Sequence, residues 1–172
     1  MRLRKAYYED FKNFIGMYKD MKLHCLYSPV ELQPDIKLAE ELSEEEKRHL
    51  IEMEILSEQF LSFYKEYGFK DFEADLERYE ILIFCRDDGK SKGVDGYFML
   101  AQFEPGIWRI VEWGCQPITK SNRLAMLQLL FKNARVVKIK KIELISYCSK
   151  EFYRSQGFTE INNGFFQKKC EA

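Results

Sequence analysis

The chain has 172 residues, about the size of one domain, and its 46% hydrophobic, 15% aromatic and 32% charged residues exclude a disordered or collagen-like protein. The net charge is −1, but residues 1–80 carry −7 and residues 81–172 carry +6, a separation that favours an anionic ligand or reflects solvated surface lysines. No stretch approaches the roughly 18 to 20 apolar residues of a membrane span, and five scattered cysteines without a CxxC pair indicate free thiols in a reducing cytoplasm.

The first half of the chain begins with a short predicted strand and continues with helices. The strand covers residues 2–6, and an acidic pair starting at Glu9 favours the beginning of a helix directly after it. Ser43 followed by Glu46 fits a capping box, which predicts the start of a long helix. We expect that helix to end at Gly68.

The hydrophobic period then changes from that of helices to that of strands. Three sequential strands are predicted over residues 80–85, 94–102 and 107–115, and the tight turns between them favour an antiparallel meander. The remaining elements are an amphipathic helix after Pro117, a strand over 141–147 parallel to its neighbour, a short helix over 149–156 ended by Gly157, and two strands joined by a hairpin turn at 162–164. This order predicts the α+β class with a mixed sheet.

That order of elements resembles the GNAT superfamily of acyl-CoA-dependent N-acyltransferases over nearly the whole chain. Residues 3–10 are similar to the family's opening strand and first helix, and residues 152–158 read FYRSQGF, similar to its FYxxxGF ending. The stretch 113–117, which includes Trp113 and Cys115, precedes a helix where the family binds acetyl-CoA. The resemblance implies one GNAT-like domain over residues 1–172, with a mostly antiparallel mixed sheet flanked by about four α-helices.

The family's pyrophosphate loop has the form Q/R-x-x-G-x-G/A, and its best match here is Lys120, Ser121, Asn122, Arg123, Leu124 and Ala125. Backbone N–H groups at a helix N-terminus bind a pyrophosphate, and small residues let that backbone approach it. Arg123 stands at the usual glycine, so we expect its N–H to donate still and its side chain either to swing away or to contact a phosphate. An ordinary helix start capped by Ser121 or Asn122 fits the same residues.

Two side chains are candidates for proton transfer. Glu112 is the only carboxylate of its predicted strand, and alternation places it on the face of Ile110 and Gly114. It is a candidate general base, acting directly or through water, or an exposed glutamate paired with a lysine. Tyr153 matches the position at which many family members protonate the departing thiolate, or it packs in the core. Ser146 falls where the family often has an asparagine contacting the cofactor arm, which makes it a cofactor-binding candidate.

The resemblance implies an enzyme that transfers acetyl from acetyl-CoA to a primary amine on a small molecule or a peptide, without a metal ion. A non-catalytic GNAT-shaped binding or regulatory module is the alternative, because Arg123 replaces the loop glycine. A nucleic-acid binder using the basic residues of 105–141 is disfavoured because no reading motif accompanies them. We expect a cytoplasmic monomer or homodimer that does not associate with membranes.

Overall fold

The computed structural model describes residues 1–18, 67–86, 93–116, 119–146 and 150–170. Its strands form one seven-stranded sheet in the order β1-β2-β3-β4-β5-β7-β6. They are β1 (Arg2–Lys5), β2 (Glu80–Cys85), β3 (Gly96–Glu104), β4 (Ile107–Cys115), β5 (Lys141–Ile145), β6 (Thr159–Asn162) and β7 (Phe165–Lys169). All neighbours pair antiparallel except β4 and β5, which are parallel. The predicted α+β class and the mixed, mostly antiparallel sheet are confirmed.

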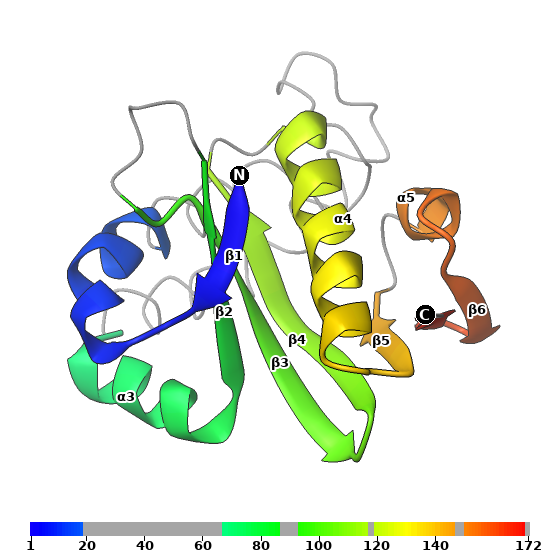
Figure 1. Cartoon of the computed structure of the whole chain (residues 1–172), viewed down its shortest axis with the longest axis horizontal. Helices are drawn as coiled ribbons and strands as arrows, with labels where there is room; N and C mark the ends of the chain where they lie inside the picture. The colour runs from blue at the N-terminus through cyan, green and yellow to red at the C-terminus, as the bar shows by residue number, and fades with distance from the viewer. Residues whose placement is uncertain (19–66, 87–92, 117–118, 147–149, 171–172) are drawn as a thin grey trace, which may run out of the picture.

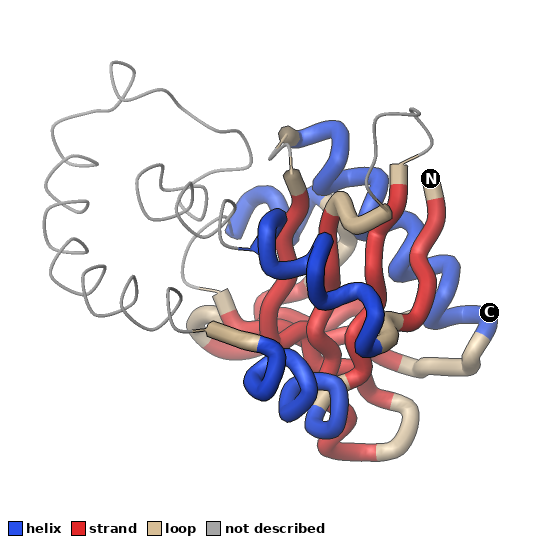
Figure 2. Tube along the Cα trace, turned by 90° about the vertical axis from the view of Figure 1, so that its left-hand side faces the viewer, coloured by secondary structure: helices blue, strands red, loops and turns tan. Residues whose placement is uncertain are grey.

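Helices lie on both faces of this sheet (Figures 1 and 2). One face carries helical residues 11–18, which follow the short η1 (Tyr8–Asp10), and α3 (Phe69–Arg78). The other face carries α4 (Lys120–Val136), with the short α5 (Lys150–Ser155) beside it. None of these helices, within the described ranges, is long and apolar enough to cross a membrane.

Helix α3 was not predicted from the sequence. The long helix expected from Ser43 falls on residues outside the described ranges, apart from residues 67 and 68. Gly68 is the N-cap of α3. The Gly68 N–H donates to the Asp71 carboxylate at 2.8 Å, and Phe72 is fully buried against the sheet. A capping acid followed by an apolar residue was the signal available in the sequence.

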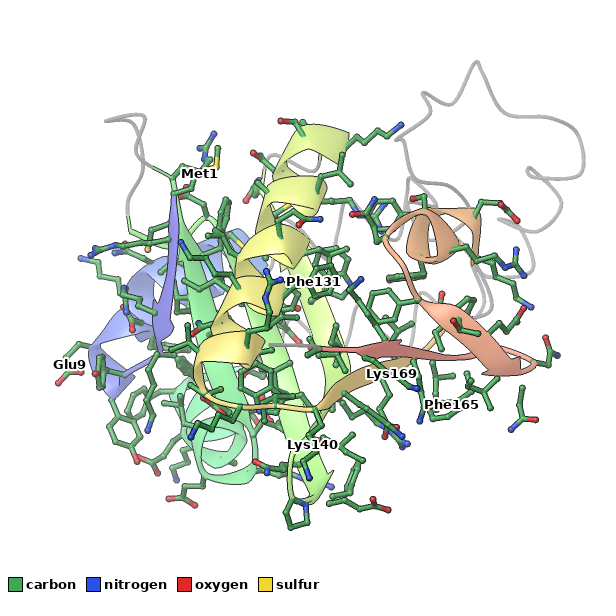
Figure 3. The ribbon with its side chains drawn as sticks, turned by 45° about the vertical axis from the view of Figure 1, so that its right-hand side comes forward. Met1, Glu9, Phe131, Lys140, Phe165 and Lys169 are labelled. Atoms are coloured by element: carbon green, nitrogen blue, oxygen red, sulfur yellow. The ribbon has the colours of Figure 1, made fainter. Side chains whose placement is uncertain are left out.

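Alternation along the central strands divides the apolar side chains between two cores. Tyr97 and Met99 of β3 face residues 11–18 and α3, whereas Phe98 and Leu100 face α4 and α5. Figure 3 shows Phe131 projecting from α4 toward the C-terminal part of the chain, where its ring centroid lies 5.8 Å from that of Phe158. Residues 96–101 of β3 are all buried, as expected of a strand covered on both faces.

Gly157 ends α5 as predicted and fixes the position of Tyr153 on that helix. The N–H of Gly157 donates to the Arg154 carbonyl at 3.0 Å, and the N–H of Phe158 donates to the Tyr153 carbonyl at 3.1 Å. These two bonds form a Schellman motif, which requires the left-handed φ of +89° at Gly157. The accompanying apolar contact joins the rings of Tyr153 and Phe158, whose centroids are 5.8 Å apart.

We expect Gly157→Ala to lower the free energy of unfolding by about 1 to 2 kcal/mol, because a side chain is disfavoured in the left-handed conformation. Gly106→Ala, in the turn between β3 and β4 at φ +78°, is the matched control for the backbone penalty. Urea denaturation should show the larger loss for Gly157→Ala, because its methyl group displaces the Lys168 ammonium from the Gln156 carbonyl, whereas a methyl group at 106 meets nothing closer than 3.7 Å. Only the change at 157 should alter the near-ultraviolet circular dichroism of the Tyr153 region. An unchanged stability of Gly157→Ala would contradict this account of the helix end.

A cluster of charges ties α5 to β6. Glu160 accepts from the Lys150 ammonium at 2.8 Å, from the Arg154 guanidinium at 2.7 Å and from the Gly164 N–H at 3.0 Å. The hydrogen bond from Lys150 contributes most, followed by Gly164 and Arg154, and together they lower the pKa of Glu160 from its usual 4.5 to about 2. A carboxyl with a lowered pKa stabilises the fold above its unfolded value and loses this contribution as pH falls.

The difference in unfolding free energy between the wild type and Glu160→Gln should therefore shrink as pH falls from above 4.5 toward about 2. Denaturant titrations at a series of pH values measure that difference directly. A difference that stayed constant across this range would show that Glu160 contributes through something other than its charge.

Candidate active site

The parallel strands β4 and β5 pair over only part of their length. Pairing joins Ile107 through Ile110 to Lys141 through Leu144, yet β4 continues to Cys115. Residues 111–114 of this central strand are exposed or half-buried, whereas the neighbouring β3 is buried over six consecutive positions. Within the described residues, β5 does not pair with this end of β4, and we call the gap between the two strands the opening.

A β-bulge at Val111 marks the point where β4 leaves β5. Leu100 of β3 is opposite Ile110, and the preceding Met99 is opposite Glu112, so Val111 is an extra residue in β4. A bulge shifts the alternation of side chains by one position. Ile110 faces α4, but Glu112 shares the opposite face with its cross-strand partner Met99.

This corrects the predicted face of Glu112. The alternation expected from the sequence placed Glu112 with Ile110, and the bulge separates them. The same shift turns Trp113 and Cys115 toward α4 and α5, into the core that also contains Ile110. At the opening, Glu112 therefore lies on the face of the sheet that carries α3, and Trp113 lies on the face that carries α4.

Helix α4 begins beside the end of β4, at the top of the molecule in Figure 1. Thr119 is its N-cap, and the Thr119 hydroxyl accepts from the Asn122 N–H at 3.1 Å. The predicted caps Ser121 and Asn122 are wrong, because the helix starts two or three residues earlier than they require. The Arg123 N–H donates to the Thr119 carbonyl at 3.0 Å, so it is used inside the helix and does not serve as the expected anion donor. Earlier N–H groups of the first turn lack carbonyl partners within the helix and form its positive end.

The Arg123 side chain turns inward. It is only 7% exposed, and its guanidinium carbon lies 4.2 Å from the Phe152 ring centroid and 5.4 Å from that of Trp113. The other basic residues within 105–116 and 119–141 are exposed or half-buried. Arg123 therefore brings a desolvated cation from α4 to the place where β4 faces α5.

Tyr153 lies at the same place. Its side chain is 7% exposed, and its hydroxyl accepts a hydrogen bond from the Trp113 indole Nε1 at 3.2 Å. The Tyr153 ring contacts those of Phe152, Phe158 and Phe166, with centroids 5.4 to 5.8 Å apart. This side chain therefore packs in the core, as one of the two predicted interpretations expected, and its hydroxyl meets Trp113 of β4.

The remaining predicted residues are distributed around this centre. Cys115 is 1% exposed and packs between the sheet and α4. Leu124 and Ala125 are half-buried in the first turns of α4, whereas Lys120 and Ser121 are exposed there. The Ser146 N–H donates to the Gly164 carbonyl at 2.7 Å, which holds the end of β5 against the final hairpin. Among the described residues there is no group of three or more His, Cys, Asp or Glu side chains placed to hold a metal ion.

Sequence reasoning did not find Thr119, Phe98 or the part played by Phe152. Phe98 is opposite Trp113 in the sheet, and their rings stack with centroids 5.2 Å apart. Phe152 was noted within the FYRSQGF stretch, but its contact with Arg123 depends on how α4 and α5 meet. The sequence holds a signal for Thr119 alone, because a threonine before a helical pattern is a common N-cap.

No family model matches the sequence, and no curated protein matches it either. Solved structures do match in three dimensions. The PaiA N-acetyltransferase of Thermoplasma acidophilum, crystallised with coenzyme A, is 15% identical over 98% of both chains, with a TM-score of 0.55. A GCN5-related N-acetyltransferase of Rhodopseudomonas palustris is 15% identical over 97% of this chain and 94% of its own, at 0.58. A GNAT-family acetyltransferase of Staphylococcus aureus is 11% identical over 99% of both chains, at 0.54.

The architecture is therefore that of the GNAT N-acetyltransferases, as the sequence resemblance implied. At identities of 11 to 15% the likeness concerns the fold, and the chemistry of this chain depends on its own residues.

Proposed function

We propose that this chain is an acyl-CoA-dependent N-acyltransferase that transfers acetyl from acetyl-CoA to a primary amine on a small molecule or a peptide. The observation that carries the proposal is the meeting of three elements at one point. Trp113 from the open end of β4 reaches Tyr153 of α5 at 3.2 Å, and Arg123 from the first turn of α4 lies 4.2 Å from the neighbouring Phe152 ring. The crystallisation of a structural neighbour with coenzyme A supports the same proposal.

The residues present fit an acyl-CoA with one departure. The first turn of α4 offers the positive end of a helix, which favours a pyrophosphate, and Lys120 is exposed on that turn. The open end of β4 offers backbone groups for an amide-rich arm. The departure is Arg123 at the position of the loop glycine. A guanidinium can stack on a ring with its face and donate to a phosphate through its edge, so its contact with Phe152 is compatible with this binding.

Acetyl-CoA supplies a thioester: the amine nitrogen bonds to the acetyl carbon, and the carbon–sulfur bond breaks. In the proposal Tyr153 gives its phenol proton to the departing sulfur and is reprotonated by solvent. Glu112, on the other face of the opening, accepts a proton from the amine directly or through water. Glu112 and Trp113 are consecutive residues of β4 and face opposite sides of the sheet, so in this proposal the base and the acid beside Trp113 approach the reacting atoms from opposite sides.

If Glu112 is the general base, the pH–rate profile of kcat/KM should have an acidic limb that disappears in Glu112→Gln. Glu104→Gln, at the end of β3, is the control, because it removes an exposed carboxylate without touching the opening. The measurement is the initial rate across pH with saturating acetyl-CoA. If Glu112→Gln keeps the acidic limb, the group that removes the proton from the amine is water or another residue.

A non-catalytic binding module is the second candidate function, and one observation favours it. The buried guanidinium of Arg123 and the rings of Trp113 and Phe152 fill the space where β4 faces α5. Tyr153 is 7% exposed in this arrangement, so acetyl-CoA reaches its hydroxyl only if neighbouring side chains move.

An assay of CoA thiol release from acetyl-CoA with a panel of primary amines tests the enzymatic proposal. We expect thiol release that requires an amine, accompanied by an acetylated product in mass spectrometry. Tight CoA binding without turnover on any amine would favour the binding module, and absence of both binding and turnover would contradict both functions.

A further inference from the structure

We propose that Trp113 is a positioning residue whose indole N–H holds the Tyr153 hydroxyl so that its proton points toward the departing sulfur. The inference rests on the proposed acetyl transfer and assigns a part of that reaction to a tryptophan on β4. Three features of the described residues support this inference. The Trp113 ring is held by its neighbours, its indole N–H can only donate a hydrogen bond, and the bulge at Val111 turns the ring toward α5.

The indole ring lies nearly parallel to two neighbouring aromatic rings. Phe98 stacks on it at a centroid distance of 5.2 Å and an interplanar angle of 9°, and Phe152 lies over it at 6.4 Å and 17°. The Arg123 guanidinium carbon also lies over this ring, 5.4 Å from its centroid, so a tilt of the indole would disturb three contacts. The direction of the Nε1–H group is therefore fixed relative to Tyr153, 3.2 Å away.

The hydrogen bond between Trp113 and Tyr153 can run in only one direction. An indole nitrogen donates a hydrogen bond and accepts none, so the Tyr153 oxygen must be the acceptor. The phenol proton is thereby directed away from Trp113. A donor at the same oxygen also stabilises the phenolate that forms when the proton leaves, because hydrogen bonds to a charged oxygen are stronger than those to a neutral one.

The bulge at Val111 is what places the ring there. Without the extra residue, alternation would put Trp113 on the face of residues 11–18 and α3, away from Tyr153. The same irregularity that opens β4 thus turns its tryptophan toward α5. The bulge therefore determines both where β4 leaves β5 and where the Trp113 N–H meets Tyr153, the proposed acid.

A double-mutant cycle separates positioning from packing. Trp113→Phe keeps an aromatic ring beside Phe98 and Phe152 but removes the N–H, so we expect kcat to fall about 5- to 20-fold, with the KM for acetyl-CoA nearly unchanged. In the Tyr153→Phe background the same change should alter kcat by less than about twofold, because the acceptor is already gone. Trp108→Phe, a buried tryptophan on the same strand and facing the same core, should leave kcat unchanged.

Nuclear magnetic resonance gives a readout that needs no activity. The chain has two tryptophans, hence two indole N–H resonances, and Tyr153→Phe should shift the one lost in Trp113→Phe while leaving that of Trp108 in place. Equal losses of kcat in both backgrounds, or an indole resonance insensitive to Tyr153→Phe, would overturn the positioning role. A wild type that binds CoA but acetylates no amine would instead overturn the proposed function, and the positioning role with it.

Discussion

Replacing Tyr153 with phenylalanine is expected to lower kcat about 100-fold, while the KM for acetyl-CoA changes by less than about twofold. The substitution removes one hydroxyl and keeps the ring, which packs against Phe152, Phe158 and Phe166. Stability should therefore change little, apart from the lost hydrogen bond to Trp113. The loss in kcat measures how much the reaction depends on proton transfer from the Tyr153 phenol to the leaving sulfur.

Steady-state kinetics at saturating amine measure the effect, and Tyr79→Phe is the control. Tyr79 follows α3 beside the core that lies on the opposite face of the sheet, so losing its hydroxyl should leave kcat unchanged. If Tyr153→Phe retains the wild-type kcat, the hydroxyl serves packing and its hydrogen bond to Trp113, and the proton comes from solvent.

Replacing Arg123 with alanine is expected to weaken CoA binding about 10- to 100-fold, since a hydrogen bond to a charged group contributes about 1.5 to 3 kcal/mol. The dependence of binding on salt should weaken as well, because one cation fewer meets the phosphates. The position of the guanidinium at the start of α4 is the reason for this expectation. Isothermal titration with CoA at two salt concentrations measures both effects.

Lys132→Ala is the control for charge, because Lys132 is an exposed cation farther along the same helix. It should change the CoA affinity far less than Arg123→Ala does. If Arg123→Ala tightens CoA binding, the arginine fills the space that the loop glycine leaves open in GNAT acetyltransferases. The binding-module function would then gain support over the enzyme.

The strands could be predicted closely because their signals are local. The predicted segment 107–115 is β4 to the residue, and 80–85 is β2. The predicted 94–102 begins and ends two residues before the observed Gly96–Glu104, and the Asp95 carboxylate just before β3 accepts from the Arg86 N–H at 2.7 Å. Local alternation and turn residues determine these boundaries to within a few positions.

The site could be predicted only in part, because its geometry depends on contacts between distant segments. The sequence led to Trp113, Arg123 and Tyr153, and the structure brings all three together. The face of Glu112 was wrong because a bulge arises from the pairing of two strands and leaves no mark on the alternation of one. The inward turn of Arg123 depends on Phe152, an aromatic ring supplied by a helix that follows much later in the chain.

Binding of acetyl-CoA beside the first turn of α4 is tested most directly by thermal unfolding with and without CoA. At a ligand concentration 100 times Kd, the stabilisation should be about 2.7 kcal/mol, which raises the Tm of a chain this size by about 5 to 10 °C. Pantetheine, which lacks the pyrophosphate, should give a much smaller shift if the positive end of α4 holds the phosphates. An unchanged Tm at millimolar CoA would contradict acyl-CoA binding by this chain.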